Sequence, residues 1–177
     1  YSEDPFLSGK MAAAVVRGVQ EEGTCGAVIK HFACNNQEDN RMGVDVHISE
    51  RALREIYLRG FEIAVKESAP VAIMTSYNWV NGVHAANSRA LCTVIAREEW
   101  GFDGVLMSDW STTAPEDGSI PWKCIEAGND LIMPGSEKDD ADIRQAYADG
   151  RLSEKEIRLC AGRIISLINK LDKKTKK

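Results

Sequence analysis

Asp109 is the residue of this sequence that is best placed to do chemistry. It lies in the tripeptide Ser108-Asp109-Trp110, directly after the apolar run 104–107, which is typical of a buried parallel strand. A carboxylate beside an aromatic ring suits reactions at a sugar carbon that becomes cationic, because the ring packs on the sugar while the carboxylate attacks or stabilises the carbon. The alternative is an Asp that only caps the following helix.

A group of hydrogen-bond donors follows an earlier apolar run. Lys30 and His31 are adjacent, and Arg41 lies further along the chain. Together they would form a donor-rich surface suited to hydroxyl groups or to a carboxylate. A lysine at a strand end can also form a Schiff base, as in some barrel lyases. A third interpretation is a structural ion pair with Glu38 or Asp109.

Two further polar positions lie near the ends of other apolar runs. Tyr77, in the segment 74–78, is placed to donate a hydrogen bond to Asp109, which would keep that carboxylate ionised and oriented. The alternative is a core tyrosine with a satisfied hydroxyl group. Asp130 is either a second carboxylate of the site or an ion-pair partner, and we favour the structural role.

Short apolar runs alternate with longer segments of helical periodicity, which predicts an α/β fold of βα units around a parallel sheet. A leading helix over 9–20 has no preceding strand. About four βα units behind this helix predict half of an eight-stranded (β/α)8 TIM-type barrel, whose strand ends would carry the site. Half of a barrel has two unpaired sheet edges that something else must cover. The four predicted strands cover residues 27–32, 71–77, 104–108 and 130–133.

The predicted helices have recognisable start and stop signals. Ser49 and Ser88 are placed as N-caps, and Gly101 follows the end of the second of these helices. Residues 153–156 (Ser-Glu-Lys-Glu) form a capping box that opens the final helix. These signals delimit the elements that must hold the polar strand ends in position.

The composition argues against several classes of protein. The 177 residues carry a net charge of −5, so no nucleic-acid partner is expected, and the basic stretch 170–177 is predicted to be a solvated end. No apolar run is long enough to cross a bilayer, so no membrane partner is expected either. The five cysteines lack metal-ligand spacing, which predicts reduced, mostly buried thiols, no metal and no cofactor. Unpaired cysteines and the lack of an Asn-x-Ser/Thr sequon slightly favour a cytoplasmic location.

In order and spacing, these motifs resemble the barrel domain of the family 3 glycoside hydrolases, the β-glucosidase family. The resemblance covers residues 1 to about 171 and leaves a lysine-rich tail at 172–177. Residues 1–5 resemble the segment after the third barrel strand, and the chain does not begin with Met, so we expect the second half of the barrel. The motifs are Lys30-His31-Phe32 with Arg41, Met74-Thr75-Ser76-Tyr77-Asn78, Ser108-Asp109-Trp110, and Ala127-Gly128-Asn129-Asp130 with Met133-Pro134-Gly135.

The resemblance implies a retaining, exo-acting β-glycosidase, above all a β-glucosidase. Its sugar would be held in the innermost subsite while Asp109, as nucleophile, forms a covalent glycosyl-enzyme. β-Xylosidases and β-N-acetylglucosaminidases share the scaffold, and a carbohydrate-binding fragment without turnover is an alternative from another class. The other implied site residues bind or surround the sugar: Lys30, His31 and Arg41 would bind its hydroxyl groups, Tyr77 would lie beside the nucleophile, Met74 would be an apolar lining residue and Trp110 an aromatic wall.

Retaining hydrolysis also needs a second carboxyl group, about 5 Å from the nucleophile, as acid/base. In the resembled family this group usually comes from outside the matching segment, and no motif here resembles it. Glu38 follows a binding motif, so we interpret it as an orienting or ion-pairing residue. We therefore expect a companion polypeptide that supplies the first barrel half and the acid/base for hydrolysis of a β-linked glucoside or related sugar.

Overall fold

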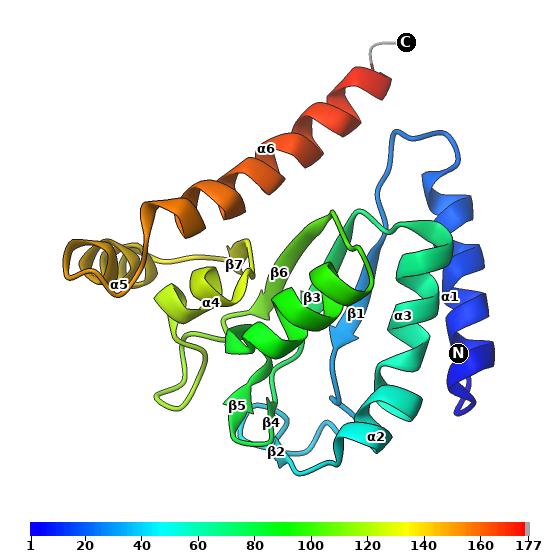
Figure 1. Ribbon diagram of the computed structural model, residues 1–177, viewed down its shortest axis with the longest axis horizontal. Coiled ribbons are helices and arrows are strands. Elements are labelled where there is room, and N and C mark those ends of the chain that lie inside the picture. The colour runs from blue at the N-terminus through cyan, green and yellow to red at the C-terminus, as the bar shows by residue number, and fades with distance from the viewer. Residues whose placement is uncertain (176–177) are drawn as a thin grey trace.

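The computed structural model describes residues 1–175 and contains a parallel sheet with helices packed around it (Figure 1). The four strands of this sheet lie in the order β1-β3-β6-β7 and are parallel throughout. All four predicted strands are therefore confirmed. Most of their ends differ from the predicted ones by one or two residues. Their bounds are β1 (Val28–Phe32), β3 (Ala72–Thr75), β6 (Val105–Trp110) and β7 (Leu131–Met133).

A second, smaller sheet and several short helical segments complete the structure. The small sheet consists of β2 (Asp45–Val46), β4 (Trp79–Val80) and β5 (Val83–His84). The helices are α1 (Pro5–Gln20), α2 (Glu50–Ala52), α3 (Arg59–Ser68), α4 (Pro121–Ala127), α5 (Glu137–Ala148) and α6 (Glu154–Thr175). Two π-helical segments, η1 (Leu53–Tyr57) and η3 (Ala90–Glu99), and the 3-10 turn η2 (Ala85–Asn87) lie between them.

The predicted helix ends agree with the observed capping contacts. Ser49 Oγ accepts a hydrogen bond from Ala52 N at 3.2 Å, and Ser88 Oγ accepts one from Leu91 N at 3.3 Å. In the predicted capping box, Glu156 N donates to Ser153 Oγ and Ser153 N donates to Glu156 Oε2. The capping residues do not predict the hydrogen-bond pattern inside the helices.

The helix after Ser88 is π-helical rather than α-helical. Trp100 N donates to Ile95 O at 3.1 Å, a bond that spans five residues instead of four. The long helix predicted from Ser49 is likewise interrupted, because Leu58 N donates to Leu53 O at 2.9 Å. The helical periodicity of these segments predicts a helix at each place, but it does not distinguish the α-helical from the π-helical hydrogen-bond pattern.

The main core lies between the sheet and the layer of helices formed by α3 and η3. Phe32, at the end of β1, is fully buried and packs edge-on against Phe61 of α3 and against Trp100. Ile73 and Leu106, on β3 and β6, are also fully buried in this cluster. The strand ends that carry the polar motifs are therefore held from behind by a continuous apolar layer.

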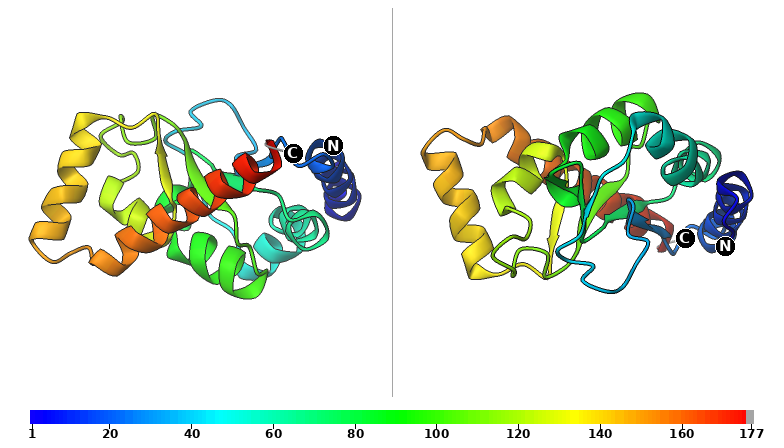
Figure 2. Two further views of the ribbon diagram at one scale, coloured as in Figure 1. Left: turned by 90° about the horizontal axis from the view of Figure 1, so that it is seen from above. Right: turned by 90° about the horizontal axis from the view of Figure 1, so that it is seen from below.

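Helix α6 covers the opposite end of the sheet, across the amino ends of the strands (Figure 2). Ile164 and Leu167 pack against Val71 and Val105 there. The helix extends to Thr175, so it includes the start of the predicted tail at 172–177, whose residues 176–177 lie outside the described part. No helix within residues 1–175 has the length and apolar character that crossing a membrane requires.

Candidate active site

Asp109 lies at the carboxyl end of β6 and is only 6% exposed. Its two carboxylate oxygens have different partners. Oδ1 accepts a hydrogen bond from the Trp110 backbone N–H at 2.7 Å, and Oδ2 lies 3.3 Å from His31 Nε2. The carboxylate is therefore held in one orientation by the strand that carries it and by a side chain from another strand.

His31 comes from β1, which is not the neighbour of β6 in the sheet, because β3 lies between them. Both β1 and β6 depart from regular pairing where the two side chains meet. β1 has one extra residue relative to β3 between Ile29 and Phe32, and β6 has one extra residue relative to β7 between Met107 and Trp110. Such bulges re-aim side chains at a strand end, and here they contain His31 and Asp109.

The backbone around His31 has further special geometry. The peptide bonds Lys30-His31 and Phe32-Ala33 are both cis. The next strand holds this segment, since Ser76 N donates to Phe32 O and Ser76 Oγ donates to Ala33 O, both at 2.8 Å.

The environment of His31 favours a neutral imidazole. Burial is the largest effect and lowers its pKa, and the charges of Lys30 and Arg41 lower it further. The Asp109 carboxylate opposes them and raises the pKa, but the net shift is downward from 6.5. A lowered pKa favours the neutral imidazole at pH 7, so the 3.3 Å contact places a neutral ring, not a full ion-pair partner, against the carboxylate.

Tyr77 and Arg41 form the next part of the site. The Arg41 guanidinium lies over the Tyr77 ring, 4.6 Å from its centroid, and Arg41 Nη1 is 2.9 Å from Glu38 Oε2. Burial raises the pKa of Tyr77, and so do the charge of Asp109 and a hydrogen bond to it. Tyr77 thus lies beside Asp109 as the sequence predicted, and the ion-pairing interpretation of Glu38 is confirmed.

The remaining predicted residues differ in their surroundings. Met74 is 9% exposed and pairs in register with Met107 of β6. Trp110 follows Asp109 with 58% of its surface exposed, so its ring is open to a ligand or to another part of the protein. Lys30 is exposed and lines a cavity of 590 Å³ between α1, β1 and α3. The structure therefore brings His31 and Tyr77 to Asp109, with Arg41 on the Tyr77 ring, while Lys30 is exposed next to His31, whose pKa its charge lowers.

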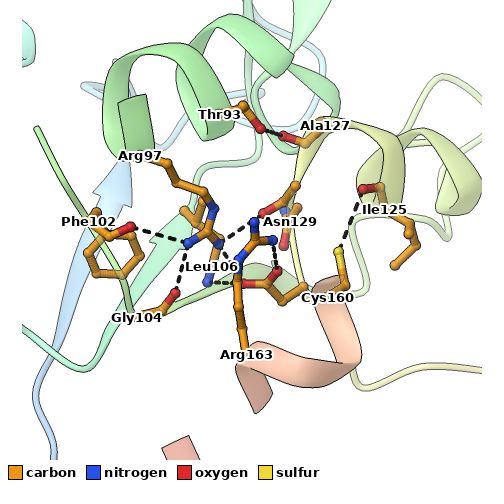
Figure 3. Close-up of polar contacts among 12 residues, drawn as sticks. Thr93, Arg97, Phe102, Gly104, Leu106, Ile125, Ala127, Asn129, Cys160 and Arg163 are labelled. Atoms are coloured by element: carbon orange, nitrogen blue, oxygen red, sulfur yellow. Dashed lines mark hydrogen bonds and ion pairs between the residues drawn. The ribbon is translucent and has the colours of Figure 1, made fainter. Parts of the chain in front are cut away.

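Asp130 has the structural role that we favoured. Its side chain is fully buried, with Oδ2 2.6 Å from Arg97 Nη2 and Oδ1 2.9 Å from Arg163 Nη1. Oδ2 also accepts a hydrogen bond from Leu106 N of β6 at 2.9 Å. Arg97 additionally donates to the carbonyl oxygens of Phe102 and Gly104, as Figure 3 shows. The cluster ties η3, β6 and α6 together behind the site, and Asp130 is not a second carboxylate of it.

Sequence reasoning missed two contributors to the site. Asn78 is 1% exposed and donates from Nδ2 to Ala33 O at 3.1 Å, which adds to the contacts that hold the loop after β1. Ser108 is fully buried and bonds to the backbone on both sides of the β6–β7 bulge. The sequence shows Ser108 only as a polar residue next to Asp109. Its role depends on the bulge, which is visible only once β6 is paired with β7.

Comparisons with known proteins agree with this geometry. A family described as "Glycosyl hydrolase family 3 N terminal domain" matches residues 1–167. The chain is 46% identical over 170 residues to an exo-α-(1→6)-L-arabinopyranosidase of Bifidobacterium breve. The alignment covers 96% of the chain and 22% of that enzyme. The chain is 46% identical over 175 residues to a β-glucosidase of Ruminococcus albus, which covers 95% of the chain and 18% of the relative. The chain thus spans about a fifth of the length of these relatives.

Solved structures give the same picture. The structure of β-glucosidase 3B from Thermotoga neapolitana in complex with glucose superimposes with a TM-score of 0.91 and 45% identity, over 99% of this chain and 25% of that one. A β-glucosidase from Kluyveromyces marxianus superimposes with a TM-score of 0.91 and 36% identity, over 99% and 21% of the two chains.

Proposed function

The chain belongs to glycoside hydrolase family 3, and we propose that it is the nucleophile-bearing part of a retaining, exo-acting β-glycoside hydrolase that acts as a β-glucosidase. The observation that carries this proposal is the pairing of Asp109 with His31 on two bulged strand ends, beside Tyr77. A buried carboxylate that is fixed by a backbone N–H and a neutral imidazole is oriented for attack without being neutralised.

In the proposed reaction, an Asp109 carboxylate oxygen attacks the anomeric carbon as the bond to the aglycone breaks. The acid/base protonates the departing oxygen, and an ester joins Asp109 to the sugar. The same acid/base then takes a proton from water, whose oxygen attacks the anomeric carbon and releases Asp109. Two inversions leave the sugar with its original anomeric configuration.

The residues around Asp109 have separate proposed tasks. His31, Arg41 and Lys30 bind hydroxyl groups of the sugar, which places the anomeric carbon near the carboxylate. Tyr77 donates to Asp109, while Met74 and the exposed ring of Trp110 provide apolar surface for the sugar and the aglycone.

We further propose that the chain is the second half of a (β/α)8 barrel, in which residues 1–171 form the partial barrel and 172–177 form its tail. A companion polypeptide would supply the first barrel half and the acid/base, and we call the two together the complete assembly. Among the described residues, β1 is an edge strand of the sheet. Helix α1, which packs on α3, exposes four apolar side chains at a spacing of four, which are Leu7, Met11, Val15 and Val19.

Alternatives of two kinds, enzymes for other sugars and a protein without turnover, can be separated from the β-glucosidase by experiment. The alternatives to glucose are the sugars of a β-xylosidase and of a β-N-acetylglucosaminidase, and the arabinopyranosidase relative adds an α-L-arabinopyranoside. A carbohydrate-binding fragment without turnover is the alternative from another class. A panel of aryl glycosides of these four sugars, assayed with the complete assembly, should show the highest kcat/KM for the β-glucoside.

Asp109→Ala separates an enzyme from a binding protein. The proposal predicts that the variant of the complete assembly loses at least about a thousandfold of turnover, because the nucleophile is gone, while it retains affinity for the sugar. Unchanged turnover would refute the catalytic role of Asp109. The chain alone is expected to hydrolyse no aryl β-glucoside, and rates equal to those of the complete assembly would refute the need for a companion.

A further inference from the structure

The hydroxyl group of Ser108 bridges two strands directly behind Asp109. Ser108 is fully buried. Its Oγ accepts a hydrogen bond from Met133 N of β7 at 2.9 Å and donates one to the Asp109 carbonyl oxygen at 2.8 Å. A single side chain therefore joins the backbone of β7 to the backbone of the residue that carries the carboxylate.

This bridge lies inside the bulge of β6. Pairing with β7 is regular at Met107, which is opposite Leu131, and resumes at Trp110, which is opposite Met133. Ser111 N donates to Met133 O at 2.7 Å on the far side. Both backbone groups of Met133 are thus bound, its N–H by Ser108 and its C=O by Ser111, with Asp109 held between these two contacts.

The bulge determines where the carboxylate points. It turns the Trp110 N–H onto Asp109 Oδ1, at 2.7 Å, and leaves Oδ2 to face His31. The bulge places Ser108 and Asp109 together opposite the single residue Ile132 of β7, between the regular pairs at Met107 and Trp110. The extra residue must be stabilised, because a bulge leaves one position of the ladder without a direct partner.

We propose that Ser108 is a positioning residue, whose hydroxyl group maintains the bulge that aims the Asp109 carboxylate at the anomeric carbon. The inference rests on the proposed role of Asp109 as nucleophile. Removing the hydroxyl group leaves the partly buried Met133 N–H and the Asp109 carbonyl oxygen without this partner, so the bulge relaxes and the carboxylate shifts. A displacement of about 1 Å at a reacting group can cost about a hundredfold in rate.

A purely structural role of Ser108 would give a different result, and the two can be separated by kinetics. If Ser108 only stabilised the β6–β7 pair, its loss would lower the free energy of unfolding and leave kcat unchanged. If it positions Asp109, its loss lowers kcat while KM changes little, because the groups that bind the hydroxyls of the sugar are on other strands.

The test uses Ser108→Ala, Ser108→Thr and Thr93→Val in the complete assembly. Thr93 is the matched control, because its hydroxyl donates to Ala127 O at 2.8 Å in the helical layer, away from Asp109. Ser108→Ala should lower kcat for an aryl β-glucoside by about 10- to 100-fold with KM within about threefold. It should slow labelling of Asp109 by a 2-fluoro glucoside equally. Ser108→Thr should recover most of the rate, and Thr93→Val should keep it.

Wild-type kcat and a wild-type labelling rate in Ser108→Ala would overturn the inference. If Ser108→Ala fails to assemble, Ser108→Cys tests the same inference, because it keeps a buried side chain but weakens both hydrogen bonds. This variant must also lower kcat. The wild-type protein separates this inference from the proposed function. Absence of any label on wild-type Asp109 refutes the nucleophile itself, whereas normal labelling of both wild type and Ser108→Ala refutes only the positioning role.

Discussion

His31 Nε2 lies 3.3 Å from Asp109 Oδ2, although β3 separates the two strands that carry these residues. The contact exists because β1 has one extra residue relative to β3 at its carboxyl end, and β6 has one relative to β7. Two side chains that a regular sheet would keep apart thereby meet above the middle strand.

Loss of the imidazole should impair the site without unfolding the protein. His31→Ala removes a partner of the carboxylate and a donor for the sugar, so we expect kcat/KM to fall by about a hundredfold in the complete assembly. The chain offers a matched control, because His47 Nε2 also lies 3.4 Å from a carboxylate, that of Asp45, but its side chain is 80% exposed. His47→Ala should retain wild-type kinetics, and an equal loss in the two variants would contradict the account.

The buried cluster around Asp130 should be essential for stability. Asp130→Ala leaves Arg97 and Arg163 without the carboxylate that both contact, and Leu106 N without its acceptor. Breaking a buried ion pair by removing one partner typically costs about 3–5 kcal/mol. Unfolding by denaturant should show such a decrease.

An exposed ion pair provides the control for that experiment. Asp149 contacts Arg151 on the surface, and Asp149→Ala should leave the denaturation midpoint nearly unchanged. If Asp130→Ala were as mild as Asp149→Ala, the cluster would not be what ties η3, β6 and α6 together.

The structure also predicts a pH dependence of stability that comes from His84. Burial lowers the pKa of this histidine from 6.5 to about 4, against the opposing charge of Asp117. Between these values the unfolded chain binds the proton and the folded chain does not, so the free energy of unfolding falls as the pH drops from about 6.5 to 4. The full effect is about 3 kcal/mol.

His84→Gln removes the titrating group and should flatten this part of the stability profile. His31, whose pKa is also lowered, contributes in the same direction and remains in the variant. The measurement is denaturant unfolding at pH 7 and pH 4.5 in both proteins. His47→Gln, at an exposed position, should leave the profile as in wild type. A profile of His84→Gln identical to that of wild type would contradict the assignment.

The sequence predicted the sheet and the capping residues because these depend on local patterns. Each strand is a short apolar run, and the Ser153 and Glu156 box needs only the two residues that form it. It also predicted which polar residues gather, because carboxyl ends of parallel strands share one edge. The bulges at His31 and Asp109 lay beyond it, since a bulge is defined by the register of two strands that are far apart in the chain.

Trapping of the glycosyl-enzyme shows directly whether Asp109 is the nucleophile. The complete assembly would be incubated with a 2-fluoro β-glucoside that carries a good leaving group, then digested, and its peptides would be analysed by mass spectrometry. We expect one 2-fluoroglucosyl group on the peptide that contains Asp109, and none in Asp109→Ala. A label on any other residue, or turnover without a covalent intermediate, would contradict this role of Asp109.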